Sequence, residues 1–202
     1  MNPIFLTYAG SSRTAASAIA ATANAVYISG SIFSSTLPVT PSAIIQAPAF
    51  GSLQNGFVEA FNTSGTGLLY ATYLSGQSLN GAANTAPAAI AADSSGNTYI
   101  AGYTTSSGYP TLNALVPNII PNTAGTTSGF LTKLTPAADG ILFSTFIPGA
   151  GITSIALAPS PQDPATQTLL LSGSIALGQS LSQPSSHPSP PPPATRPCFA
   201  SL

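Results

Sequence analysis

Charged residues are almost absent from this chain. Of its 202 residues only three are Lys or Arg and four are Asp or Glu, so 3% are charged, against roughly 25% in a typical soluble domain. Three cationic side chains cannot form the basic stripe that neutralises nucleic-acid phosphates, nor a patch that attracts anionic lipid. The scarcity of charge therefore excludes nucleic acid as a partner, and electrostatic attachment to a membrane surface.

Cysteine and long apolar runs are equally scarce. The single cysteine, Cys198, allows no internal disulfide. No apolar run approaches the ~20 residues that span a bilayer, and the run at residues 86–92 is short and made of small residues. We therefore expect neither a disulfide framework nor a membrane span.

What the chain does contain is a repeat with a period of about seventy residues. Residues 56–61 (GFVEAF) return as 129–134 (GFLTKL), and residues 69–74 (LYATYL) return as 142–147 (LFSTFI), each 73 positions later. A shorter copy (FLTYAG) occupies residues 5–10. The segments YISG, YIAG and LLSG begin at Tyr27, Tyr99 and Leu170. A fixed period indicates a modular array.

Each full unit contains four short runs that are typical of strands. They are rich in Tyr, Phe, Ile, Leu and Thr and are bounded by Gly, Asn, Ser and Pro. Expected strands are residues 4–9, 16–22 and 25–29, then 56–61, 68–74, 87–92 and 98–104, then 129–134, 141–147, 152–158 and 168–174. Several strands are apolar on both faces, which predicts stacked sheets. No long helical periodicity occurs, so helix is a minor component at most.

The repeat also predicts the organisation of the chain. We expect units at about 1–55, 56–128 and 129–178, and a disordered Pro/Ser-rich tail at 179–202, which is either a linker or read-through from a disrupted reading frame. The first three residues have no positive charge and lead directly into the repeat, so no signal peptide is expected. The chain is interpreted as a fragment or truncated product of a larger array.

These segments, in their order and spacing, resemble the bacterial β-propeller repeat often called SBBP. Residues 56–111 follow its pattern closely, including 89–104 (AIAADSSGNTYIAGYT), whereas 129–174 follow it loosely and 4–40 in part. The resemblance implies an all-β fold, an incomplete β-propeller of about 2.75 four-stranded antiparallel blades, too few for closure. It also implies a secreted or surface-associated bacterial protein without an established catalytic motif. Gly56 departs from the family's usual Asp, and residues 22–24 replace the DSSGN turn.

The acidic residues give little support to an enzyme. They are Glu59 on a strand, Asp93 and Asp139 in turns, and Asp163 in a Pro-rich segment. Nothing places two carboxylates across one bond, as glycoside hydrolysis requires, and the DSSGN turn lacks the ligands of a calcium loop. His187 and Cys198 lie in the tail, away from partners for a catalytic triad or a reactive thiol. No catalytic, cofactor-binding or metal-binding residue is predicted.

Three functions remain open. The first is a non-enzymatic scaffold or binding module, extracellular or at the cell surface, with an unknown protein or carbohydrate ligand. The second is part of a larger carbohydrate-active enzyme whose catalytic residues lie outside the chain, and the third is a truncated product without independent function. Tyr103 and Tyr109 could bind a ligand near a strand end, although core packing suits them better. Open blade edges predict self-association.

Overall fold

The computed structural model describes residues 9–77, 83–119, 127–160, 167–175 and 198–201, and in these it contains strands and no helix. The strands are β1 (Thr14–Ala21), β2 (Ala25–Ile32), β3 (Ser52–Asn62), β4 (Leu68–Leu74), β5 (Ala83–Ala92), β6 (Thr98–Thr104), β7 (Ser128–Leu134), β8 (Ile141–Pro148), β9 (Ala150–Pro159), β10 (Gln167–Ile175) and β11 (Cys198–Ser201). The prediction of an all-β fold is confirmed.

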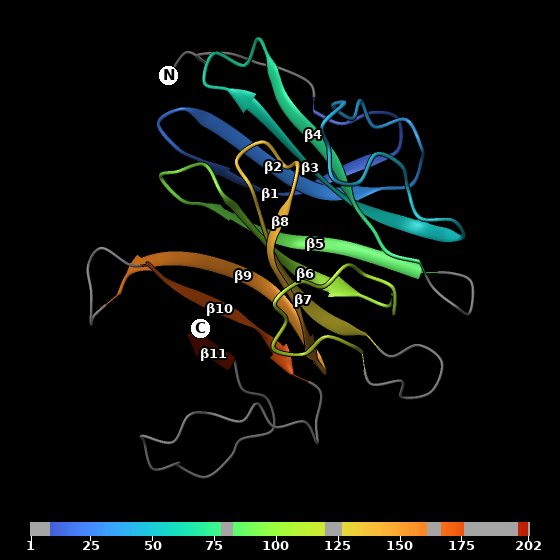
Figure 1. The fold of residues 1–202 in the computed structure, drawn as a ribbon, viewed down its shortest axis with the longest axis vertical. Coiled ribbons are helices and arrows are strands. Elements are labelled where there is room, and N and C mark those ends of the chain that lie inside the picture. Colours follow the sequence, from blue (N-terminus) through green and yellow to red (C-terminus); the bar gives the residue numbers. More distant parts are fainter. Residues whose placement is uncertain (1–8, 78–82, 120–126, 161–166, 176–197, 202) are drawn as a thin grey trace.

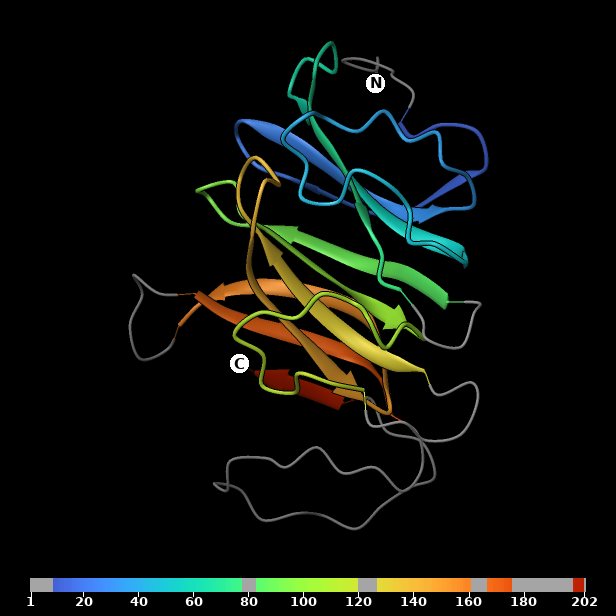
Figure 2. The same cartoon turned by 45° about the vertical axis from the view of Figure 1, so that its right-hand side comes forward.

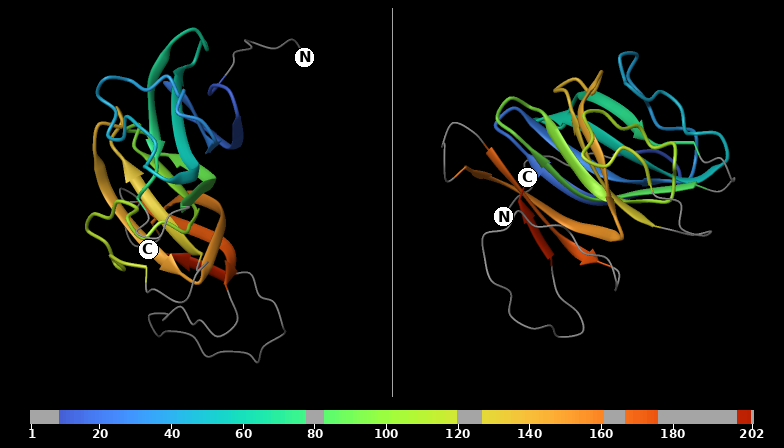
Figure 3. Two further views of the ribbon diagram at one scale, coloured as in Figure 1. Left: turned by 90° about the vertical axis from the view of Figure 1, so that its right-hand side faces the viewer. Right: turned by 60° about the horizontal axis from the view of Figure 1, so that its bottom comes forward.

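Hydrogen bonding divides the strands into three successive antiparallel groups. The first group consists of β1–β4 and the second of β5–β8, and within each of these groups every strand pairs with the next. In the third group, β10 pairs with both β9 and β11. A short parallel pairing between the beginnings of β3 and β5 joins the first two groups into one eight-stranded sheet. Figures 1 and 2 show the groups following one another along the long axis. The first and third groups lie at opposite ends, so the arrangement is not closed (Figure 3).

The groups are offset from the expected repeat units by two strands. β2 pairs with β3 from Ala25 opposite Asn62 to Ile32 opposite Asn55, although a long connector separates the two strands in sequence. β6 pairs with β7 in the same way. Each four-stranded group therefore takes its first two strands from one repeat unit and its last two from the next.

The two ends of the chain differ in how far the structure describes them. The strand expected at residues 4–9 lies almost wholly outside the described residues. The expectation of a disordered tail is wrong for residues 198–201, which form β11 against β10. β10 would otherwise present unpaired backbone groups at a free edge, and pairing satisfies them. The remainder of the tail, residues 176–197 and 202, lies outside the described residues.

A β-bulge recurs at the start of each group and explains the glycine that ends the YISG, YIAG and LLSG segments. The register shifts between Ala16 and Ala18 in β1, between Pro87 and Ala89 in β5, and between Ser172 and Gly173 in the β9–β10 pair. The glycine that faces each bulge has no room for a side chain. A Cβ added to it would lie 2.1 Å from a backbone oxygen of the bulged strand. That oxygen belongs to Ala15 for Gly30, to Ala86 for Gly102 and to Gly151 for Gly173. Only glycine permits this close backbone approach.

Successive groups pack face to face. One buried cluster joins Val58 and Tyr70 of the first group to Ile100 and Phe130 of the second, and a second cluster joins the second group to β9 and β10. The Tyr70 hydroxyl lies 3.2 Å from that of Thr98, across the first of these contacts. Residues 55–61 and 70–74 are buried without interruption. The prediction that strands are covered on both faces is confirmed for these two segments.

The connectors after β2 and β6 cover the outer edges of the first two groups. The backbone N–H of Tyr73 in β4 donates to Ile45, and that of Phe146 in β8 donates to Val116, both at 3.1 Å. Leu112 and Ser144 exchange two further backbone hydrogen bonds. These two edges, which the sequence suggests are open, are therefore paired with the chain's own connectors.

Candidate functional site

The structure places the acidic residues on separate elements. Glu59 lies in the middle of β3, Asp93 in the β5–β6 turn and Asp139 in the β7–β8 turn, whereas Asp163 and His187 lie outside the described residues. Among the residues that the structure describes, no three His, Cys, Asp or Glu side chains gather as a metal site would require. Glu59, Asp93 and Asp139 therefore have separate surroundings on three different elements.

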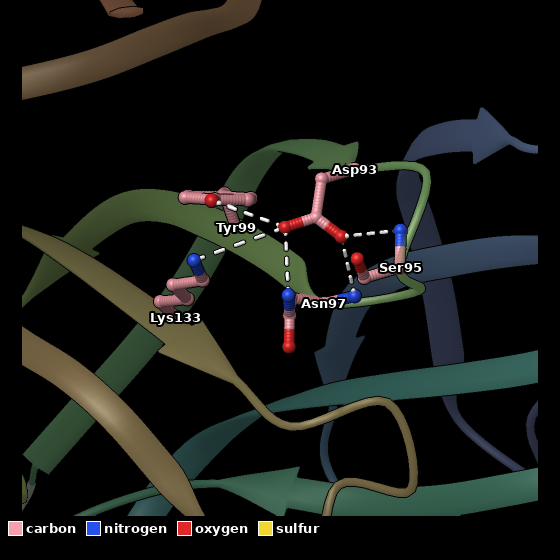
Figure 4. Close-up of polar contacts among 5 residues, drawn as sticks. All are labelled: Asp93, Ser95, Asn97, Tyr99 and Lys133. Carbon is pink, nitrogen blue, oxygen red and sulfur yellow. Dashed lines mark hydrogen bonds and ion pairs between the residues drawn. The ribbon is translucent and has the colours of Figure 1, made fainter. Parts of the chain in front are cut away.

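Asp93 organises the turn between β5 and β6 (Figure 4). Its Oδ1 accepts hydrogen bonds from the backbone N–H groups of Ser95, at 3.0 Å, and Asn97, at 2.9 Å. Its Oδ2 accepts from the Asn97 side chain at 2.7 Å. Gly96 adopts a φ of 87°, a left-handed conformation that suits glycine. Aspartate is favoured in turns because its carboxylate binds nearby backbone donors in this way.

Lys133 and Tyr99 complete the surroundings of Asp93. They lie opposite one another in the β6–β7 pairing, and the Lys133 ammonium lies 4.7 Å from the centre of the Tyr99 ring. That ammonium is 3.8 Å from Asp93 Oδ2, and the Tyr99 hydroxyl donates to the same oxygen at 3.3 Å. The carboxylate of Asp93, a residue 8% exposed, is thus surrounded by donors and one cation.

These contacts hold the pKa of Asp93 below its ordinary value. Burial acts in the opposite direction, because it disfavours the charged form. The hydrogen bonds from the side chain and backbone of Asn97, the charge of Lys133 and the Tyr99 hydroxyl outweigh burial. The fold therefore favours the ionised carboxylate, whose role here is structural.

Replacing Asp93 by asparagine is expected to lower the free energy of unfolding by about 1–3 kcal/mol at pH 7. An amide nitrogen at the Oδ2 position cannot accept from Asn97 or Tyr99, and it leaves Lys133 unpaired. The lowered pKa means that this stabilisation is present above the ordinary aspartate pKa of about 3.9 and declines as the pH falls through the pKa of the folded state. Urea titrations of both proteins between neutral and acidic pH would measure the difference.

The matched control is Asp139→Asn, in the turn between β7 and β8. The Asp139 carboxylate accepts from the hydroxyl of Thr135, and the contact is exposed. We expect this variant to lose less stability at pH 7 than Asp93→Asn. Equal losses, or a difference that persists unchanged in acid, would contradict the role assigned to Asp93.

Glu59 is the most unusual ionisable group in the described part of the chain. It is 1% exposed, and Oε2 accepts a hydrogen bond of 2.6 Å from the backbone of Gly10. Its other oxygen, Oε1, has no partner among the described residues. Burial raises the pKa of Glu59, and the Gly10 hydrogen bond offsets this only in part. Burial therefore favours the protonated form of this carboxyl group relative to an exposed one.

The second group has a different residue at the position that corresponds to Glu59. There the equivalent residue, 73 positions later, is Thr132, whose hydroxyl lies 2.9 Å from those of Tyr109 and Ser144. Thr132 lies opposite Ser144 in the β7–β8 pairing, whereas Glu59 lies opposite Ala71, which offers no hydroxyl. In the first group, Glu59 therefore replaces the threonine that belongs to a network of hydroxyl groups in the second group.

The two tyrosines considered as ligand-binding residues have different environments. Tyr109 is 3% exposed and its ring lies 4.7 Å from that of Phe130, so the interpretation of core packing is confirmed for it. Burial raises the pKa of its hydroxyl, more than the hydrogen bond to Thr132 lowers it. Tyr103, in β6, is 38% exposed. Of the pair, only Tyr103 offers an accessible ring.

Sequence reasoning missed the contribution of Lys133. It is the chain's only lysine, and it follows Thr132 on a strand. The signal that could have found it is the pairing of β6 with β7, which places position 133 opposite Tyr99, six residues after Asp93. Units that begin at Gly56 conceal this pairing, because they assign the two strands to different repeats.

Comparison with known proteins gives one family match. Residues 69–110 match the model of the SBBP family, described as a β-propeller repeat. The match runs through β4, β5, the Asp93 turn, β6 and the start of the following connector. A search of curated proteins finds none that matches the chain. The described residues include no helix that is long and apolar enough to cross a membrane. Residues 69–110 are thus similar to an SBBP β-propeller repeat, and the all-β fold of the described residues is consistent with that match.

Proposed function

We propose that the chain is a non-enzymatic scaffold or binding module with about 2.75 propeller blades, in a secreted or surface-exposed bacterial protein. Its ligand is a protein or a carbohydrate. The Asp93 carboxylate supports this proposal, because folding contacts occupy both of its oxygens. Glu59 also supports it, because it is 1% exposed and, among the residues that the structure describes, belongs to no cluster of three or more His, Cys, Asp or Glu side chains.

The observation that carries the proposal is the exposure of apolar side chains on the two connectors. Phe50 is 92% exposed and Leu115 is 66% exposed, and Ile44 and Leu112 are each exposed by 40% or more. The connectors are held against β4 and β8 by backbone hydrogen bonds. Exposed apolar groups on loops that a rigid sheet supports are typical of recognition surfaces.

The proposal is tested by binding and activity measurements on the full chain. The probes are insoluble cellulose, chitin and peptidoglycan, and purified surface proteins of the producing bacterium. We expect retention on one of these without release of reducing sugar, and at least about tenfold weaker binding for the double variant Phe50→Ser, Leu115→Ser. Release of reducing sugar would favour the carbohydrate-active alternative.

Two controls accompany these measurements. Leu69→Ser removes a side chain on β4 that is 53% exposed but does not belong to a connector, and we expect its binding to be unchanged. Location is tested separately, by immunoblots of medium, cell-surface and cytoplasmic fractions of the producing bacterium. Protein confined to the cytoplasm would contradict the proposed location.

A further inference from the structure

The chain makes the same kind of interface twice between its own strand groups. In the second group Ile90 lies opposite Ile100, and in the third Ile155 lies opposite Leu171. These pairs pack against the preceding group, with Ile90 and Ile100 6% and 0% exposed and Leu171 3% exposed. The face that bears such a pair is called here the upstream face of its group.

The upstream face of the first group is incompletely covered. Its corresponding pair is Ile19 opposite Ile28, on β1 and β2, and Ile19 is 68% exposed. Connector residues Leu37 and Ile45 cover the outer part of this face, around Tyr73. The inner part, at β1, has no strand group against it among the described residues. An isoleucine that is buried in the second group is therefore exposed in the first.

The opposite surface is incompletely covered at the other end of the arrangement. The downstream face of each group bears the residue that starts the YISG, YIAG or LLSG segment. Tyr27 is 4% exposed and Tyr99 packs against the third group, whereas Leu170, at the same position in β10, is 40% exposed. Leu169 and Leu171 face the second group, so Leu170 points away from it. Ala156 lies opposite Leu170 on β9.

We propose that two copies of this chain associate head to tail, with the upstream face of β1–β2 in one copy packed on the downstream face of β9–β10 in the other. The argument is continuity, because the new interface would repeat one that the chain already forms twice internally. β1, β2, β9 and β10 contain no charged residue, so these four strands bring no charged side chain into the contact. This inference goes beyond the proposed function, which does not require self-association.

A head-to-tail contact is heterologous, since the two partners use different surfaces. A variant that damages only the upstream face keeps an intact downstream face, and the reverse also holds. A mixture of two such variants can therefore form one intact interface and must stop at a dimer. Self-association through identical surfaces, such as strand edges, gives no such rescue.

The experiment uses the full chain in sedimentation velocity over a range of concentrations. The native chain is expected to form dimers or longer assemblies, and Ile19→Lys and Leu170→Lys are each expected to weaken association by about tenfold or more, since each buries an unpaired ammonium. An equimolar mixture of the two variants is expected to restore association as a dimer of one copy of each. Circular dichroism of each variant checks that the exposed substitution leaves the strands intact.

Leu115→Lys is the control, because Leu115 is 66% exposed but lies on a connector. It is expected to leave association unchanged. A native chain that is monomeric at every concentration would overturn the proposal, as would a mixture of Ile19→Lys and Leu170→Lys that stays monomeric. Weakening by Leu115→Lys equal to that by Ile19→Lys would also overturn it, because it would place the contact on the connectors.

Discussion

Replacing Tyr109 by alanine is expected to lower the free energy of unfolding by about 3–5 kcal/mol, the usual cost of removing a buried aromatic ring. Tyr109 belongs to a connector, yet its ring lies 4.7 Å from Phe130 and 6.2 Å from Phe146, measured between ring centres. Its hydroxyl lies 2.9 Å from that of Thr132. The substitution would empty a site in the cluster that joins the first two strand groups. Urea-induced unfolding followed by circular dichroism measures the loss.

Tyr109→Phe separates the ring from the hydroxyl. Thr132 keeps its contact with Ser144 in this variant, so we expect a loss of only about 1 kcal/mol. A ligand-binding role without a packing role would give the opposite result, namely small effects of both variants on stability. A loss below about 1 kcal/mol for Tyr109→Ala would contradict the packing role.

Gly102→Ala is the second substitution with a large expected effect, about 2–3 kcal/mol of destabilisation. The new Cβ would lie 2.1 Å from the backbone oxygen of Ala86 and 2.8 Å from the Cα of Pro87. Both atoms belong to the backbone of the bulged strand β5, which cannot move aside as a side chain could. The expected result is a lower urea midpoint with little change in far-UV circular dichroism at zero denaturant.

Gly151→Ala is the matched control, because Gly151 also lies in a strand. Its new Cβ would meet only the Ser174 hydroxyl, at 3.4 Å, an ordinary contact distance. We expect a change within about 0.5 kcal/mol of zero. If Gly102→Ala were as mild as this control, the bulge would not be the reason for the glycine that ends the YIAG segment.

The strands were predictable because their signals are local. Apolar and aromatic runs such as 98–104 are bounded by turn residues, and the Asp93 turn follows from the chemistry of its own five residues. The partners of the strands were not predictable in this way. β2 and β3 are joined by a long connector, and nothing within either strand states that they pair. β11 has no such signal, because it follows a proline-rich segment and pairs with a strand far away in sequence.

The environments of single residues were less predictable still. The sequence places Glu59 on a strand, but its burial and its unpartnered oxygen depend on the packing around β3. The contact of Lys133 with Asp93 depends on the register of β6 with β7. Tyr103 and Tyr109 are similar in sequence context, yet one is exposed and the other is buried. Tertiary packing decided these outcomes.

The two-strand offset between repeat unit and strand group has a consequence for how such an array changes its length. The β2–β3 and β6–β7 pairings have the same register. Val26 lies opposite Phe61 in the first of them, and Thr98 lies opposite Leu134 at the equivalent position of the second. Recombination between copies that removes residues 56–128 would bring β7 beside β2 in the register that β3 now holds. A gene of this kind can therefore lose or gain one repeat unit of about 73 residues and still encode complete strand pairs where the remaining units join. The reason is that the last two strands of each four-stranded group come from the following repeat unit.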